Sequence, residues 1–235
     1  MNGHQLDSKE YYDHLAKEYR KVSRHRQEYL SGINLLLLEL IKKRHVQSIL
    51  DVGTGDGLRL ESIRKQISPI ISITAIEPSE KMFFAAKKNL GADVNLLECE
   101  LCDIEETEKF HLIAALWNVI GHVDDLAAFF RKASSLIDEA NGVFVFDANN
   151  IFNVKHYGLG NFLKNKLSAL FGKKIYKFNL NAADTNGYVK LYHPKYIYKK
   201  LHMSGFNSVK VLYIDYATGR QTYKNSGQMF FLCER

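Results

Sequence analysis

Residues 49–60 read I-L-D-V-G-T-G-D-G-L-R-L, and this stretch decides the fold of the chain. A short apolar run contains Asp51 and leads into a loop with Gly53, Gly55 and Gly57. An amphipathic segment with helical spacing follows directly, so the pattern predicts a strand, a tight turn and the beginning of a helix. Glycines suit such a turn, because a backbone without a Cβ can bend sharply and approach a bound ligand closely.

The spacing of these glycines excludes two common nucleotide-binding loops. The dinucleotide fingerprint Gly-x-Gly-x-x-Gly would place its third glycine at Leu58, and a P-loop would need Gly-Lys-Ser/Thr, which the sequence lacks. The string instead resembles motif I of the class I S-adenosylmethionine (SAM)-dependent methyltransferases. A structural glycine turn in another α/β protein is the alternative. The resemblance implies SAM as the cofactor, held by Asp51, Gly53, Thr54, Gly55 and Gly57.

The composition indicates one globular domain. The chain has 235 residues, 46% hydrophobic and 25% charged, which fits a single large α/β domain with a full core. The net charge of +6 suggests nucleic acid, but 26 acidic residues are interspersed among the 32 basic ones, which favours a mixed, solvated surface. The polar N-terminus has no signal-peptide pattern and no apolar run is long enough for a membrane span, so we expect a cytoplasmic protein.

The three cysteines fit a reducing compartment. Cys99 and Cys102 form one C-x-x-C, but the sequence has no second pair with the spacing of a zinc site. A redox or metal role is therefore not favoured, and we expect no metal.

A carboxylate follows the next predicted strand. The alternating β-branched run at 71–76 predicts a strand that ends in Glu77-Pro78-Ser79. Glu77 lies about twenty positions past the glycine loop, where an acidic side chain can accept hydrogen bonds from ribose hydroxyls. The E-P-S-x-x-M string also resembles motif II of the same methyltransferases, which implies that Glu77, Pro78 and Met82 contact the cofactor.

Two further strand ends complete the predicted cofactor site. A strand at 94–97 leads to E-C-E-L-C-D-I, where the resembling families carry an aspartate for the adenine amine. We predict Asp103 in this role, with Ile104 or Cys102 supplying backbone and apolar contact. Glu100 is the competitor, because the register is open by a residue or two. A strand at 110–116 leads to Trp117 and Asn118, which the resemblance places against the methionine half of SAM, with Trp117 beside the sulfonium.

Residues 8–44 are predicted as helix, with Ser8 as a cap. A second helix in this segment carries the apolar residues from Tyr29 to Ile41 and ends in the basic run 42–44. Its Y-Y-D-H-L-A-K-E-Y stretch resembles the lid helix of small-molecule methyltransferases, in which tyrosines reach over the cofactor. The resemblance implies Tyr12 and Tyr19 as cofactor contacts, and core packing is the alternative role. We expect a helical lid over 1–44 and a methyltransferase domain over 45–235.

Residues 151–190 exceed the minimal fold. They combine a basic amphipathic segment with a predicted hairpin of 174–180 and 187–192. An insertion at this point lies above the acceptor crevice, so we expect a substrate lid or a homodimer contact. A membrane surface or an acidic carrier protein is a further partner for a basic amphipathic helix.

The last elements indicate the fold class. A helix opened by His193-Pro194 precedes predicted strands at 209–216 and 228–233. This order resembles the ending of class I methyltransferases, in which the last strand is antiparallel. The resemblance covers about 45–150 and 190–235. It implies an α/β, Rossmann-like seven-stranded, mostly parallel sheet with an N-terminal helical lid and a lid inserted after the fifth strand.

The predicted activity is methyl transfer from SAM to an O or N atom of a small-molecule acceptor. Such a displacement needs the acceptor and the methyl carbon at near-attack distance, and a general base where the acceptor loses a proton. The sequence favours no single base among the histidines and tyrosines that are candidates: His122, His193, His156, Tyr11, Tyr12 and Tyr19.

Other functions stay open at this point. An RNA methyltransferase is supported by the lysine-rich insertion, and a SAM-binding paralogue without catalysis is a further alternative. A Rossmann oxidoreductase is disfavoured by the glycine spacing. Motifs for methylation of exocyclic amines in DNA and of pyrimidine carbons are absent from the sequence. A magnesium site at Asp147 and Asn149 would need another aspartate where the chain has Trp117-Asn118.

Overall fold

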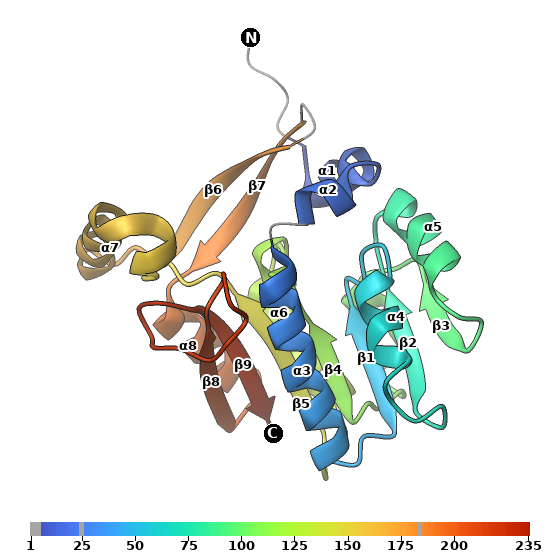
Figure 1. Ribbon diagram of the computed structural model, residues 1–235. Helices are drawn as coiled ribbons and strands as arrows, with labels where there is room; N and C mark the ends of the chain where they lie inside the picture. The colour runs from blue at the N-terminus through green and yellow to red at the C-terminus, as the bar shows by residue number, and fades with distance from the viewer. Residues whose placement is uncertain (1–5, 24–25, 183–184) are drawn as a thin grey trace.

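A seven-stranded sheet forms the centre of the computed structural model, which describes residues 6–23, 26–182 and 185–235. Its strand order is β3-β2-β1-β4-β5-β9-β8 (Figure 1). Strands β1 to β5 run parallel, and β9 pairs antiparallel with both β5 and β8. The expected Rossmann-like sheet with an antiparallel last strand is confirmed. The strands are β1 (Ser48–Val52), β2 (Ser72–Ile76), β3 (Val94–Leu97), β4 (Leu112–Ala115), β5 (Val143–Ala148), β8 (Ser208–Ile214) and β9 (Gln228–Glu234).

Helices cover both faces of the sheet, and adjacent residues of one strand serve different cores. Ile49 packs in the cluster under α3, whereas Leu50 packs with Phe130 and Leu201 from α6 and α8 on the opposite face. This division follows from the alternation of side chains along a strand. The covering helices are α3 (Gln27–Lys43), α4 (Leu58–Arg64), α5 (Glu80–Asn89), α6 (Leu126–Leu136) and α8 (Pro194–Met203), with short 3-10 turns η2 (Leu101–Asp103) and η3 (Val119–Gly121).

Residues 8–44 form three helices where two were predicted: α1 (Ser8–Leu15), α2 (Tyr19–Ser23) and α3, which is the predicted second helix. The prediction of Ser8 as the cap was wrong by one residue. Asp7 is the N-cap, and its Oδ1 accepts a 2.8 Å hydrogen bond from the Glu10 N–H, while the Glu10 carboxylate accepts from the Asp7 N–H. This reciprocal arrangement is a capping box, and it requires an acceptor side chain at the residue before the helix.

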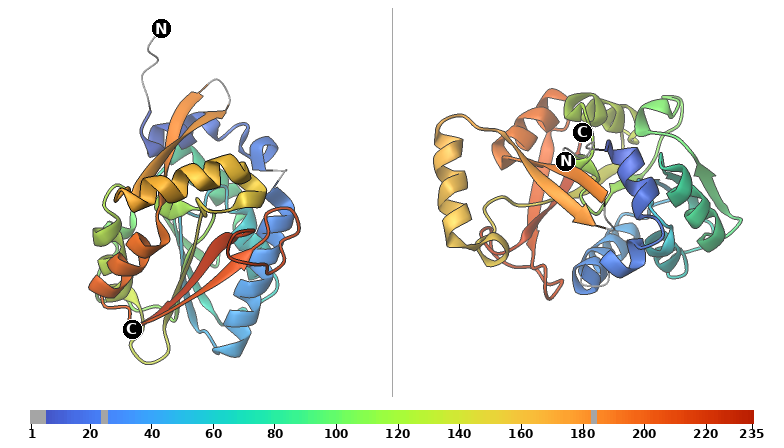
Figure 2. Two further views of the ribbon diagram at one scale, coloured as in Figure 1. Left: turned by 90° about the vertical axis from the view of Figure 1, so that its left-hand side faces the viewer. Right: turned by 90° about the horizontal axis from the view of Figure 1, so that it is seen from above.

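Segments from opposite parts of the chain meet above the carboxyl ends of the parallel strands. The hairpin of β6 (Ile175–Ala182) and β7 (Thr185–Tyr192) reaches α1, as the two views of Figure 2 show together with Figure 1. A Cβ on Gly187 would lie 2.5 Å from the Tyr11 ring, and a Cβ on Gly121 would lie 2.4 Å from Val189. The predicted hairpin is therefore present, although the tip of its expected turn, 183–184, lies outside the described residues.

The remaining inserted element is α7 (Val154–Leu170), which stands away from the sheet at the left of Figure 1. It kinks at Gly158, where φ is 79°, and none of its residues is buried. Within the described ranges, no helix combines the length and the apolar character needed to cross a membrane.

Candidate cofactor and acceptor site

The loop between β1 and α4 needs glycine at three positions, both for conformation and for space. Gly53, Gly55 and Gly57 have φ values of 67°, 63° and 77°, in the left-handed region that side chains other than glycine adopt at a cost. A Cβ on Gly53 would lie 2.9 Å from Val119 Cγ2. At Gly55 it would lie 3.1 Å from the hydroxyl of Tyr19 and 3.6 Å from Met82. The predicted loop is thus lined by the predicted lid tyrosine and by the methionine of the second motif.

Glu77 is held in place by the same loop. It is buried at the end of β2, where Oε2 accepts a 2.8 Å hydrogen bond from the Gly55 N–H and Oε1 accepts a 3.0 Å bond from the Ser79 N–H. Burial raises the pKa of Glu77 to about 7, and the two backbone donors oppose that shift. Each carboxylate oxygen retains a lone pair for a further donor, which is what ribose hydroxyls require. Half-buried Pro78 then leads the chain into α5.

Asp13 joins α1 to the N-terminus of α5, and the sequence analysis did not predict this contact. Its Oδ1 accepts a 2.6 Å hydrogen bond from the Ser79 hydroxyl and a 3.1 Å bond from the Lys81 N–H. A carboxylate at the N-terminus of α5 is also favourable for the helix dipole. The only sequence signal was its place inside the Y-Y-D-H stretch.

A buried ion pair lies beside the glycine loop. Arg59 Nη2 donates to Asp51 Oδ1, and the two side chains are 12% and 1% exposed. Three buried polar atoms find no partner among the described residues: Asp51 Oδ2 and Arg59 Nη1 of this pair, and Thr54 Oγ1 of the glycine loop. Buried polar groups are nearly always hydrogen-bonded, so these atoms fit a site that a polar ligand completes. Arg59 was not predicted, although its position in the first turn after the loop was readable.

The adenine end of the predicted site lies at η2. Asp103 is exposed there, and its Oδ2 accepts a 2.9 Å hydrogen bond from the Glu100 N–H, while Ile104 is buried. Cys99 and Cys102 are free thiols in the same segment. The choice of Asp103 over Glu100 stays a prediction.

The loop after β4 is held in an unusual conformation by a buried carboxylate. Trp117 and Asn118 have φ values of 71° and 59°, left-handed for two consecutive non-glycine residues. Asp147 Oδ1 accepts a 2.7 Å hydrogen bond from the Asn118 N–H, and its Oδ2 accepts a 2.7 Å bond from the Tyr29 hydroxyl. Asn118 in turn accepts a 3.3 Å bond from the Asn149 N–H. Asp147 and Asn149, considered above for magnesium, are therefore engaged with this loop.

Four of the predicted residues come together where α1 and α2 meet the segment after β4. The rings of Tyr19 and Trp117 lie 5.3 Å apart, and those of Tyr12 and Tyr19 lie 6.3 Å apart. The Tyr12 hydroxyl lies 3.1 Å from His122 Nε2. Burial lowers the pKa of His122 to about 4, with Lys190 adding to the shift, and burial raises the pKa of Tyr12. His122 is therefore neutral at neutral pH, and Tyr12 keeps its proton.

The other two histidines lie elsewhere. His193 is the N-cap of α8, where Nδ1 accepts a 3.1 Å hydrogen bond from the Lys195 N–H, and its ring packs 5.3 Å from that of Phe152. His156 packs 5.1 Å from Tyr216. The guanidinium of Arg26 lies 5.8 Å from the Trp117 ring and 5.4 Å from the Tyr216 ring. Arg26 thus stands between the cofactor side and the side of His156, and the sequence carried no signal for it.

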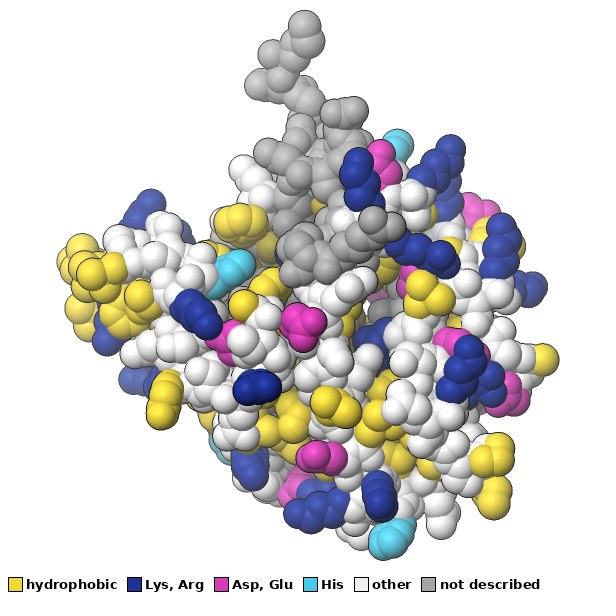
Figure 3. Space-filling model, in the orientation of Figure 1, with side chains coloured by type: hydrophobic (Ala, Val, Ile, Leu, Met, Phe, Trp, Pro, Cys, Tyr) yellow, Lys and Arg dark blue, Asp and Glu magenta, His cyan; other side chains and the backbone are white. Residues whose placement is uncertain are grey.

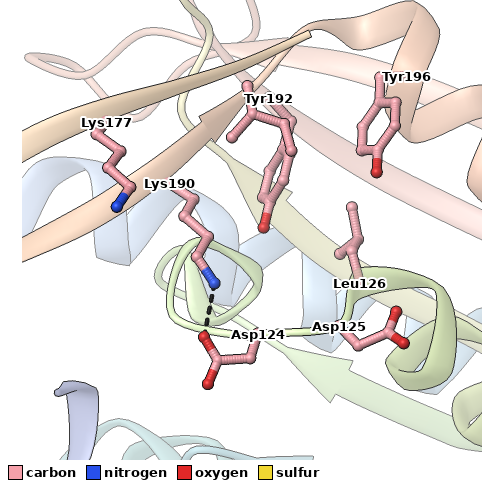
Figure 4. Close-up of a pocket in the computed structure, with 8 residues that line it drawn as sticks. Asp124, Asp125, Leu126, Lys177, Lys190, Tyr192 and Tyr196 are labelled. Carbon is pink, nitrogen blue, oxygen red and sulfur yellow. Dashed lines mark hydrogen bonds and ion pairs between the residues drawn. The ribbon is translucent and has the colours of Figure 1, made fainter.

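The surface has two further hollows. One of about 290 Å³ lies between the loop before α6 and the β6–β7 hairpin, where Lys190 pairs with Asp124 at 2.7 Å (Figure 4). A larger one of about 670 Å³ lies at the other end of the sheet, lined by residues between 35 and 47 and between 66 and 71. In the part of the chain that the structure describes, no three His, Cys, Asp or Glu side chains are grouped to hold a metal ion.

Comparison with known proteins places this geometry in context. The family described as "Methyltransferase domain" matches residues 49–139. A curated relative, "Uncharacterized protein MJ1252" of Methanocaldococcus jannaschii, is 25% identical over 149 residues. That match covers 63% of this chain and 53% of the relative, so it spans about half of the relative's length.

Solved structures share the fold over nearly the whole chain. A SAM-dependent methyltransferase from Clostridium acetobutylicum has a TM-score of 0.62 at 18% identity, over 95% of this chain and 98% of the other. The CcbJ methyltransferase of Streptomyces caelestis has a TM-score of 0.67 at 12% identity, over 97% and 99%. The glycopeptide N-methyltransferase MtfA, solved with SAM, has a TM-score of 0.57 at 12% identity, over 100% and 98%. At these identities the likeness is one of fold.

Proposed function

We propose that the chain is a class I SAM-dependent methyltransferase, with SAM as its cofactor, and that it methylates an O or N atom of a small-molecule acceptor. The cofactor supplies a methyl group that is already activated on a sulfonium. What the protein must add is a fixed relative position of donor and acceptor, which can supply ~7–11 kcal/mol of the barrier. A small acceptor is supported by the contact of Tyr11 with Gly187, which closes α1 and the hairpin over the crevice.

The proposed cofactor contacts follow from the atoms that lack partners. Asp51 and Arg59 would hold the amino and carboxylate groups of the methionine half, since Asp51 Oδ2 and Arg59 Nη1 are buried and unpaired within the described structure. Glu77 would accept from the ribose hydroxyls, and Asp103 from the adenine amine. Trp117 would present its ring to the sulfonium.

We propose that Tyr12 and His122 transfer the proton of the acceptor. The contact between these two side chains is the observation on which the catalytic proposal rests. In the tautomer with hydrogen on Nδ1, His122 Nε2 is an acceptor for the Tyr12 hydroxyl. An acceptor group would give its proton to the Tyr12 oxygen as Tyr12 passes its own proton to Nε2. Burial keeps His122 neutral at neutral pH, so its Nε2 lone pair is available, and the same burial disfavours the imidazolium that this transfer would form.

Binding of S-adenosylhomocysteine tests the cofactor part of the proposal by thermal shift. The wild type is expected to be stabilised, and Gly55→Val and Glu77→Ala are each expected to abolish the shift. Gly160→Ala is the control, because a Cβ there meets nothing within 4 Å. Normal binding by both site variants would contradict the assignment of this loop.

Methyl transfer from labelled SAM to a panel of metabolites tests the acceptor class. Labelled small molecules, with activity that survives a chelator, are the expected result. Label in RNA with a steep salt dependence would instead support an RNA methyltransferase. Tight cofactor binding with no labelled product in either pool would support a paralogue without catalysis.

A further inference from the structure

The outer face of α7 is apolar and uncovered. Leu170 and Phe171 are 82% and 84% exposed at the C-terminal end of the helix. Three more leucines precede them at intervals of four, four and three residues, a spacing that aligns side chains along one face of a helix. These are Leu159, Leu163 and Leu167, and each is more than half exposed.

The charged side chains of α7 and of the chain on either side of it are all basic. The sequence from 151 to 182 holds six lysines and no aspartate or glutamate. Five of these lysines are exposed, namely Lys164, Lys166, Lys173, Lys174 and Lys177. Of the ion pairs found among the described residues, only that of Lys155 with Asp215 involves a lysine of this segment. Figure 3 shows hydrophobic and basic side chains gathered at the left edge, over the place where Figure 1 draws α7.

Specific contacts on its inner side hold α7 in this orientation. Asn165 Nδ2 donates a 2.9 Å hydrogen bond to the Ile151 carbonyl, and the Tyr176 hydroxyl donates a 3.2 Å bond to the Asn165 carbonyl. The rings of Phe162 and Phe152 meet edge to face with centroids 6.2 Å apart. The leucine face is therefore presented outward by a fixed element of the fold.

The positive charge around this face indicates which kind of partner covers it. A second copy would bring the same lysines against themselves, and like charges at a contact are repulsive. A membrane with anionic headgroups complements both features, because lysines pair with the headgroups while leucine and phenylalanine enter the acyl boundary. We propose that α7 and the turn after it dock this enzyme on an anionic lipid surface. The docking does not depend on which acceptor the enzyme methylates.

Flotation of the full-length protein with lipid vesicles tests the proposal. Vesicles of phosphatidylcholine with phosphatidylglycerol should capture the wild type, whereas pure phosphatidylcholine should capture ~10-fold less. The double variant Leu170→Glu/Phe171→Glu should lose ~10-fold or more of the binding. Ile70→Glu is the matched control, since Ile70 is 90% exposed at the opposite end of the sheet, and it should bind as the wild type does.

Three results would overturn the proposal. They are no capture of the wild type by either vesicle, equal capture of the double variant, and a wild-type dimer in size-exclusion chromatography that the double variant converts to a monomer. An unchanged thermal shift with S-adenosylhomocysteine establishes that the double variant is folded. That measurement also separates a failure of docking from a failure of the cofactor site.

Discussion

The backbone N–H of Asn118 donates a 2.7 Å hydrogen bond to Oδ1 of Asp147, and this bond joins the end of β5 to the loop after β4. The bond matters because Asn118 and Trp117 are both left-handed, a conformation that costs ~1–3 kcal/mol for each such residue. Asp147 is buried and also accepts from Tyr29. Its carboxylate therefore maintains the conformation that aims the Trp117 ring.

Replacing the carboxylate of Asp147 by an amide should strongly destabilise the fold. In Asp147→Asn one acceptor becomes an NH₂ that faces a donor, so we expect a loss of ~2–4 kcal/mol in the free energy of unfolding and weaker cofactor binding. Urea unfolding measures the first effect. Asp125→Asn is the control: Asp125 is an exposed N-cap of α6, and asparagine caps equally well. Equal stability of the two variants would contradict the role given to Asp147.

Cofactor affinity should depend on pH through Glu77. Its pKa of about 7 in the free protein means that the carboxyl is protonated below that value and has one acceptor fewer for the ribose. Binding favours the ionised form, so affinity should fall by up to ~10-fold per pH unit below about pH 7 and level off above it. Calorimetric titration with S-adenosylhomocysteine measures this slope. Glu77→Gln should remove the pH dependence of the affinity, whereas the exposed control Glu80→Gln should keep it. A wild type whose affinity does not change with pH would exclude the linkage.

The contact between Tyr12 and His122 predicts coupled effects on turnover. Tyr12→Phe and His122→Gln should each lower kcat by ~10²–10⁴-fold if the acceptor loses a proton, and leave the affinity for S-adenosylhomocysteine within a few fold. The double variant should be little worse than either single one, because both residues serve one proton path. His193→Asn, which keeps a capping side chain on α8, should retain activity. If the losses in kcat of the two single variants add up in the double variant, Tyr12 and His122 do not serve one proton path.

The glycine loop allows a direct comparison between two glycines. Gly53→Ala places a Cβ 2.9 Å from Val119 in a left-handed residue, so we expect a loss of ~1–3 kcal/mol in the free energy of unfolding. Gly160→Ala in α7 meets no neighbour and should be neutral or stabilising by ~0.5–1 kcal/mol. Thermal or urea unfolding of both variants measures the difference. A Gly53→Ala protein as stable as the wild type would show that the loop can relax.

The sequence predicted best those features whose signal lies within one short segment. Gly55 and Glu77 are each marked by their own strand–turn context, and the structure joins them by a 2.8 Å hydrogen bond. The seven-stranded sheet was implied by the resemblance to class I methyltransferases, and the structure has it. Helix ends were less accurate, since whether Asp7 or Ser8 caps α1 depends on the backbone at one residue.

The partners that depend on tertiary structure were not predictable. Arg26 comes beside Trp117 and Tyr216 only because α3, β4 and β8 converge, and no spacing in one chain segment encodes that. Asp147 stood out at a strand end, yet its bond to Asn118 spans 29 residues of chain. The contact of Tyr12 with His122 likewise spans 110 residues, so the sequence offered no reason to prefer His122 to His193 as the candidate base.

The contact between the Tyr11 ring and Gly187 has a kinetic consequence. It closes the crevice by joining a helix near the start of the chain to a hairpin near its end, without a side chain from the glycine. A flat ring on a bare backbone can separate and return without any rotamer change. A cofactor that leaves between α1 and the hairpin would need this separation, and the opening rate of the joint would then set an upper limit on turnover. A bulkier residue at 187 would hold the enzyme open, trading retention of the donor for faster exchange.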